Sequence, residues 1–264
     1  MTSIGGPNHA TPYVNSAFQS TRVWLNEIAS GKNSYTTTSP AKLMIGNRLL
    51  NTAQRSSVAN MNVGFATSRA QTVDSYLQGT HDTVSRLKEL SVQANNGLLT
   101  DNDRDAINAE AQELMKHLGQ TYQTARFNGQ EVLQGGTADV AVTADGDKAT
   151  VTNGDTSFAK LGIEGLDLST QEGAEAALEA LDTATDEISN QRAQIGTDLR
   201  KLEDQYEANL AAEANLREAS SNQMDTDIAR ASTEFSTASI RSQVASAVAS
   251  QGNQLQGSMI SALL

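Results

Sequence analysis

Residues 59–94 read ANMNVGFATSRAQTVDSYLQGTHDTVSRLKELSVQA, and one row of mostly small or apolar side chains recurs through them at alternating steps of four and three residues. The members of this row are Ala59, Val63, Ala66, Ala70, Val73, Leu77, Thr80, Val84, Leu87, Ser91 and Ala94. A seven-residue repeat sustained over this length keeps a narrow stripe facing a partner helix and predicts a left-handed supercoil. Because many of the positions are alanine, we expect the two helix axes to approach closely.

The partner for this helix is predicted in the C-terminal half of the chain. From Ala174 to Gln251 the only glycine is Gly196, and the segment is rich in strong helix formers. A second seven-residue row runs through it, with an adjoining row one step away, and both are expected to be core: Leu181, Ile188, Ile195 and Leu202, then Leu178, Leu199 and Tyr206. We expect one long helix here with a break near Met224–Asp227.

Shorter elements are predicted between these two helices. Thr100 and Asp103 form a T-x-x-D helix start, so a second, shorter helix follows it. Residues 139–143 and 149–152 alternate in polarity and are joined through Asp145-Gly146, which predicts a β-hairpin. The fold class is therefore mainly α, a long antiparallel helical rod or coiled-coil bundle with a small β-hairpin region at about 130–172 and with paired N- and C-terminal helices.

Both ends of the chain carry amphipathic stripes. All three prolines lie in the first 40 residues, so the rest of the chain can form uninterrupted helices up to the C-terminus. Neither terminal helix could bury its apolar face alone. The candidate self-assembly residues are Val14, Trp24, Ile28, Ile228, Phe235, Val244, Val248, Leu255, Met259 and Leu263.

The composition excludes several classes of partner. The formal net charge of −12 predicts repulsion from nucleic acid and from anionic membranes. No segment approaches the roughly 20 apolar residues that cross a bilayer, so membrane insertion is not expected. The first basic residue is Arg22, too late for the start of a Sec-type signal peptide, so secretion is expected by another route.

Catalytic, metal and cofactor chemistry is also not expected. The chain has no cysteine and three histidines, and no nucleophile elbow, zinc motif or phosphate-binding loop is present. Asp101, Asp103 and Asp105 have the alternate spacing of a calcium loop, but Ala106 and Gln112 occupy the positions that require Gly and Glu. Acidic residues that cap a helix start explain the same pattern. An active site built from scattered carboxylates is the one enzyme alternative.

Several sequence blocks resemble the bacterial flagellins. The N-terminal blocks are 28–32 (IASGK), 45–49 (IGNRL), 86–97 (RLKELSVQANNG) and 126–129 (RFNG). The C-terminal blocks are 195–196 (IG), 225–229 (DTDIA), 234–235 (EF), 242–243 (SQ), 251–254 (QGNQ) and 263–264 (LL). Residues 33–42 lack the paired acids usual for the family, and residues 5–12 lack its usual Asn-Thr-Asn start.

The resemblance implies an arrangement in layers and a structural function. Residues 1–40 and 224–264 would be the inner-core terminal helices, residues 41–223 the helical layer with the hairpin, and no outer domains would be present. The chain would be a secreted, extracellular subunit that self-assembles into the flagellar filament for swimming motility. Its partners would be further copies of itself, an export chaperone and the export apparatus, hook-associated and cap proteins, and a host Toll-like receptor.

The receptor expectation rests on three residues that match the family positions read by that receptor, Arg86, Leu90 and Glu110. Arg86 and Leu90 are four residues apart, which places them on one face of the expected helix, while Leu87 belongs to the buried row. The alternative is that Arg86 and Glu110 are solvated polar residues, with Arg86 paired to Glu89 or Glu110.

Two other functions fit the same helical pattern. A hook–filament junction protein has the same chain ends but adapts the filament instead of forming it. A secreted coiled-coil adaptor would never polymerise. Polymerisation by the chain alone distinguishes a filament subunit from both.

Overall fold

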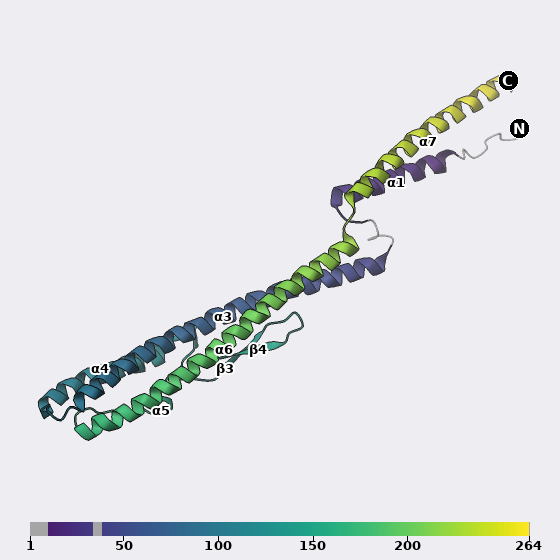
Figure 1. Cartoon of the computed structure of the whole chain (residues 1–264). Coiled ribbons are helices and arrows are strands. Elements are labelled where there is room, and N and C mark those ends of the chain that lie inside the picture. The colour runs from purple at the N-terminus through teal and green to yellow at the C-terminus, as the bar shows by residue number, and fades with distance from the viewer. Residues whose placement is uncertain (1–9, 34–38, 264) are drawn as a thin grey trace. The chain divides into compact units, whose positions relative to one another are not determined.

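The computed structural model describes residues 10–33 and 39–263, and most of them are helical (Figure 1). The departures noted at residues 5–9 and 34–38 lie outside the described residues. The long helices are α1 (Ala10–Ser30), α3 (Pro40–Ala94), α4 (Asp101–Thr124), α6 (Gln171–Met224) and α7 (Ile228–Leu263). The shorter elements are β1 (Arg126–Phe127), β2 (Gln130–Glu131), β3 (Thr137–Ala141), β4 (Lys148–Thr152) and α5 (Phe158–Leu161).

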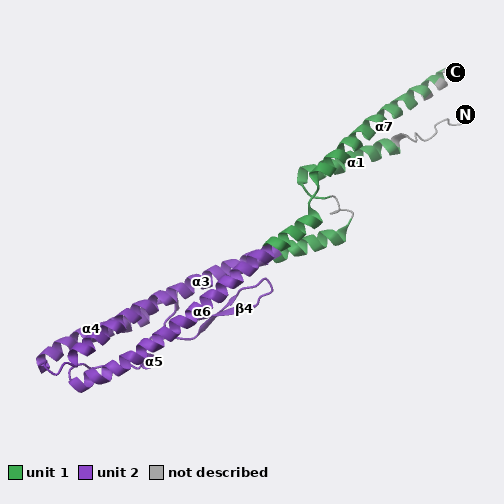
Figure 2. Cartoon of the chain, viewed as in Figure 1, with its two compact units in different colours: residues 1–52, 214–264 green, residues 53–213 purple. Residues whose placement is uncertain are grey.

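The chain folds as two compact units (Figure 2). Unit 1 comprises residues 1–52 and 214–264, and unit 2 comprises residues 53–213. The layers implied by the family resemblance divide instead at residues 40/41 and 223/224. Those layers describe positions in an assembly, and they stay a prediction.

The core of unit 2 follows the two seven-residue rows. Every member of the row from Ala59 to Ala94 is buried, as are Leu181, Ile188, Ile195 and Leu202 of α6. The predicted pairing of two long helices is confirmed, and so is the predicted break, because α6 ends at Met224 and α7 begins at Ile228. The adjoining row is less buried than expected, because Tyr206 is 43% exposed and Leu178 and Leu199 are only half-buried.

The turn from α3 into α4 is closed by side chains that bond to the backbone. The Thr100 hydroxyl accepts from the Asp103 N–H (3.3 Å), and the Asp103 carboxylate accepts from the Thr100 N–H (3.0 Å), which forms a capping box. These hydrogen bonds to Thr100 lower the pKa of Asp103. The buried Arg104 guanidinium donates to the carbonyl oxygens of Ala94 (3.0 Å) and Leu99 (3.1 Å). Asp103 therefore serves as a helix cap.

The predicted hairpin forms from β3 and β4, with Asp139 opposite Thr150 and Gly146 in the turn at φ 93°. A second hairpin, β1 with β2, was not predicted. Its turn is Asn128-Gly129, with φ values of 49° and 78°, the left-handed region that Asn and Gly tolerate best. Its strands are only two residues long, so no alternation of polar and apolar residues could indicate them in the sequence.

Polar side chains fasten these hairpins to the long helices. The buried Arg69 guanidinium of α3 donates to the side-chain oxygens of Gln130 (3.0 Å) and Asn153 (2.7 Å). Burial lowers the pKa of Arg69, because no carboxylate accompanies it in these bonds. From α6, the Asp198 carboxylate accepts from the Thr152 N–H (3.0 Å). Both helices of the pair thus hold the strand region.

In unit 1, α1 packs along α7, and short connecting segments tie the two helices together (Figure 1). The Asn33 N–H donates to Met224 O (2.8 Å), and the Thr226 N–H donates to Gly31 O (3.0 Å). Between these bonds Lys32 forms an ion pair with Asp225 (2.5 Å). We call this group of contacts, residues 31–33 with 224–226, the connector clasp.

The connector clasp predicts an acid-sensitive contribution to stability. Hydrogen bonds from Lys32 and Ser221 hold the pKa of Asp225 below its usual value of 3.8. Since the folded pKa is lower than the unfolded one, the contribution is complete above the usual value and is lost as pH falls through the lowered one. Asp225→Asn should lower the free energy of unfolding by at most about 1 kcal/mol at pH 7, because the pair is half-exposed.

Thermal unfolding followed by circular dichroism at pH 7 and pH 3 checks this, with Asp204→Asn, an exposed carboxylate on α6, as the control. The difference between the wild type and Asp225→Asn should shrink at pH 3. A difference that stays the same at both pH values would contradict the prediction.

Candidate assembly surfaces

The predicted apolar face of α1 lies against α7. Val14, Trp24 and Ile28 of α1 are half-buried, as is Phe235 of α7. On α7 the closest packing is made by small residues, since Ala231 and Ala238 are buried. These candidate residues are therefore partly used within unit 1, and their remaining exposed area is available to another molecule.

A second apolar face of α7 is not covered. Ile240, Val244, Val248 and Leu255 are 55–61% exposed, and Ile228 is also exposed. At about 100° per residue, Ile240 to Leu255 form a stripe roughly 130° around the helix from Ala231 and Ala238. We call these four residues the outer α7 stripe. Ile240 was missed from the sequence, although it lies four residues before Val244 in the same stripe. The side chains of Met259 and Leu263 are outside the described part of the chain.

Arg86 and Glu110 meet on the surface of unit 2, between α3 and α4. The Arg86 guanidinium donates to Glu110 Oε1 (2.7 Å) and to Glu89 Oε2 (2.9 Å). The hydrogen bonds to Glu110 and then to Glu89 raise the pKa of Arg86. The polar pairing given as the alternative for these residues is therefore present.

The expectation that Leu90 shares an exposed face with Arg86 was wrong, because Leu90 is 1% exposed and belongs to the core. In this region α3 has two helical neighbours. Arg86 reaches Glu110 on α4, and Lys88 pairs with Asp182 on α6. A helix packed against two neighbours buries a wider face than one seven-residue row, and Leu90 falls within that wider face.

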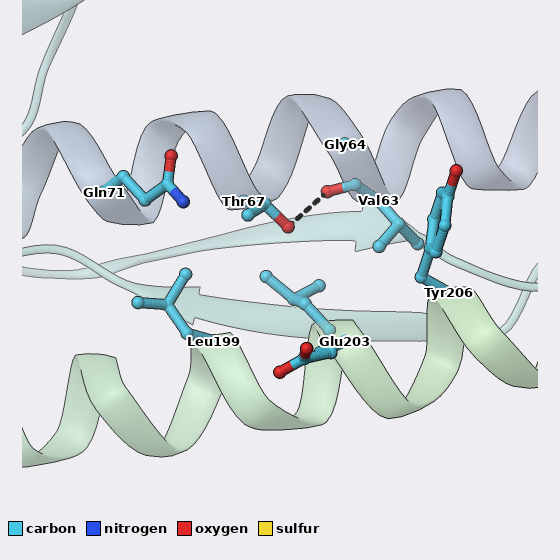
Figure 3. A pocket seen from close by; sticks show the side chains of 8 residues that line it. Val63, Gly64, Thr67, Gln71, Leu199, Glu203 and Tyr206 are labelled. Atoms are coloured by element: carbon cyan, nitrogen blue, oxygen red, sulfur yellow. Dashed lines mark hydrogen bonds between the residues drawn. The ribbon is translucent and has the colours of Figure 1, made fainter.

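A groove of about 500 Å³ opens between α3 and α6 in unit 2 (Figure 3). It is lined by Val63, Gly64, Thr67 and Gln71 of α3 and by Leu199, Leu202, Glu203 and Tyr206 of α6. Figure 3 shows Tyr206 reaching from α6 toward α3 at one end, with Gln71 near the other end. The Thr67 hydroxyl donates to its own helix at Val63 O (2.9 Å). The groove thus has an apolar floor and a largely uncharged rim.

An ion pair joins α3 and α6 next to the groove. Arg192 Nε donates to Asp74 Oδ1 (2.8 Å), and this bond raises the pKa of Arg192. Asp74 lies seven residues after Thr67, and Arg192 lies seven residues before Leu199, so both continue the faces that line the groove. An ion pair therefore joins α3 and α6 at Asp74, whereas the groove between the two helices is open at Thr67.

A glycine in the interior of α3 is part of the groove lining. A Cβ atom added to Gly64 would meet nothing within 4 Å. An interior helix glycine costs about 1 kcal/mol relative to alanine. Packing within the described chain does not require this cost at Gly64.

One buried polar side chain lies beside the groove. Asn60 is 8% exposed, and neither its Oδ1 nor its Nδ2 has a hydrogen-bond partner among the described residues. It precedes Gly64 by one helical turn and so lies on the same face of α3. Buried amides are nearly always hydrogen-bonded, so this one is an exception among the described residues.

Comparison with known proteins places these surfaces in a family. Residues 9–138 match the model of the bacterial flagellin N-terminal helical region, and residues 178–263 match that of the C-terminal helical region. The flagellar filament 33 kDa core protein of Treponema phagedenis is 32% identical over 225 residues, which cover 78% of each chain.

The chain belongs to the flagellin family. The flagellin of Halalkalibacterium halodurans is a more distant relative, 28% identical over 71% of each chain. The crystal structure of Bacillus cereus flagellin is similar with a TM-score of 0.51 and 25% identity, over 56% of this chain and 88% of that one. The resemblance stated from the sequence is confirmed, together with the mainly helical fold class.

Membership of the flagellins also decides the question of catalysis. Flagellins are structural filament proteins and not enzymes, so the prediction that this chain is not an enzyme is confirmed by its family. No helix among the described residues is long and apolar enough to span a bilayer. The candidate sites of this flagellin are therefore surfaces for association.

Proposed function

We propose that this flagellin is a structural subunit that self-assembles into the bacterial flagellar filament for swimming motility, outside the cell. The observation that carries the proposal is the two-sided α7 helix. Its alanine-rich face packs on α1, while the outer α7 stripe has no cover within the described chain. Apolar faces of this kind on a soluble subunit are buried by association.

The relatives support a filament in particular. The relatives from Treponema phagedenis and Treponema maltophilum are named flagellar filament core proteins. Contacts between unlike faces of identical subunits extend without closing and produce helical filaments. Stacked subunits of this kind transmit the rotation of a motor as thrust, and they need no catalytic group.

The outer α7 stripe predicts how assembly fails. Purified wild-type monomer should polymerise when salt is raised or seeds are added, because salt screens the net charge of −12. Val244→Asp should suppress polymerisation, because it places a charge in the stripe that assembly desolvates. Ser246→Asp adds the same charge at an exposed position away from the stripe and should assemble nearly as the wild type does. Electron microscopy and sedimentation measure both outcomes.

The same experiment separates the alternative functions. Long uniform tubes support a filament subunit. Short wild-type stubs in the presence of competent seeds would support the junction protein instead, and discrete oligomers would support the secreted adaptor. Equal assembly of Val244→Asp and wild type would remove α7 from the interface.

We also propose that a flagellar export chaperone covers α7 before secretion through the export apparatus, and that hook-associated and cap proteins contact the assembled subunits. The exposed outer α7 stripe supports this, because uncovered apolar surface invites premature association in the cell. Deletion of residues 235–264 should abolish chaperone binding in a pull-down. Binding unchanged by the deletion would exclude this segment as the site.

A host Toll-like receptor is proposed to read Arg86 and Glu110, with Leu90 supporting them from the core. Arg86 and Glu110 are exposed and adjacent, which suits recognition of a polar surface. Arg86→Ala should reduce receptor-reporter activation by monomer, because it removes the charge and the hydrogen bonds to Glu110 and Glu89. Lys116→Ala, on the exposed side of α4, is the control. Full receptor activation by Arg86→Ala would contradict the proposal and assign the Arg86–Glu110 ion pair a structural role only.

A further inference from the structure

We propose that the α3–α6 groove is an interface between copies of this chain, and that it receives an apolar ridge on α3 of a second copy. The ridge consists of Val58, Met61 and Phe65, which are 44–64% exposed and spaced three and four residues apart. The groove and the ridge both lie in unit 2. This inference rests on the proposed function, since it names the faces through which subunits would meet.

The first observation is a gap in the charge of α3. Between Arg55 and Asp74 the only charged residue is Arg69, whereas 19% of all residues in the chain are charged. Arg69 is buried under the strand region. The exposed surface of α3 from residue 56 to residue 73 is therefore uncharged, in a chain whose net charge makes copies repel one another. Interface cores are depleted in charge and enriched in aromatic residues and methionine, as this surface is.

The second observation is that the ridge and the groove are different faces at the same level of the helix. At about 100° per residue, the ridge lies roughly 140° around α3 from Val63, Gly64, Thr67 and Gln71. Phe65 is held in place by an edge contact with Phe127, with ring centroids 5.1 Å apart. A rigid apolar ridge and an open groove on one unit are complementary features. A second copy can therefore bind through its ridge or its groove and leave the other of these two faces free for a further copy.

The third observation is the space that the groove keeps open. No described atom lies within 4 Å of the Cβ that Gly64, a lining residue of the groove, would carry. An incoming chain would supply the missing side-chain volume. Packing within one copy does not.

The geometry also determines the kind of assembly. Because ridge and groove are unlike faces, the contact is heterologous, and each added copy presents the same pair of faces again. This arrangement builds a ring or a helix of subunits side by side. A contact between two identical faces would stop at a dimer.

The first test fills the groove. Gly64→Leu should leave the monomer folded, because the added side chain enters open space and leucine favours helix more than glycine does. It should raise the critical concentration for polymerisation by about tenfold or more, because it blocks a packed contact. Gly79→Leu is the matched control, since Gly79 is also an α3 glycine with nothing within 4 Å, and it should change the critical concentration less than about twofold. Circular dichroism of both monomers checks folding.

The second test uses the absence of cysteine from the natural sequence. Met61→Cys marks the ridge and Gln71→Cys marks the groove. Filaments co-assembled from the two single variants should give covalent dimers with a short bismaleimide. Filaments of either variant alone should give none, because like faces do not meet.

The outcomes distinguish this interface from the proposed function. Wild-type protein that does not polymerise overturns both. Wild-type filaments together with normal assembly of Gly64→Leu, or cross-links in Met61→Cys filaments alone, overturn this interface and leave the filament function standing. Loss of assembly in Gly64→Leu without mixed cross-links assigns the groove to another occupant and also overturns the pairing.

Discussion

The core shared by α3 and α6 is the constraint on which the rest of unit 2 depends. The helix α3 has 55 residues and no proline after its first position. Most of the stability of a helix in a protein comes from packing of its apolar face, so the buried row of α3 has to pack against another element. That row is rich in alanine, and burial of alanine yields little free energy per residue. Stability is therefore spread along the whole length of the pair. The strands and α4 pack against an axis that these two helices have already defined.

Hydrogen bonds from polar side chains of the long helices hold the strand region in place beside the small core. Arg69 and Asp198 reach from opposite helices to backbone and amide groups of the two hairpins. Each of these bonds lies in a partly buried setting, where a missing partner would cost more than the bond itself contributes. The strands are thereby positioned beside Phe65, and their placement gives the ridge on α3 its rigid support.

Periodicity allowed prediction of the elements that depend on neighbouring residues in the chain. The seven-residue row of α3, the end of α6 at Met224, the helix start at Thr100 and the turn at Gly146 are all local features, and each was predicted. Leu90 and Tyr206 were misplaced, because their burial depends on how many elements surround the helix at that level. Leu90 has α4 beside it, whereas Tyr206 borders the open groove. The β1–β2 hairpin was missed because two-residue strands carry no periodic signal, although Asn128-Gly129 was a usable turn signal.

The alanine seam has a mechanical consequence. Large side chains interlock deeply, so sliding one helix along another requires them to leave their holes, whereas alanines form shallow knobs with little to withdraw. Ala59, Ala66 and Ala70 are buried members of the α3 row at the level of the groove. A small axial slip of α3 at this level should therefore meet a lower barrier than it would if the row were made of leucines.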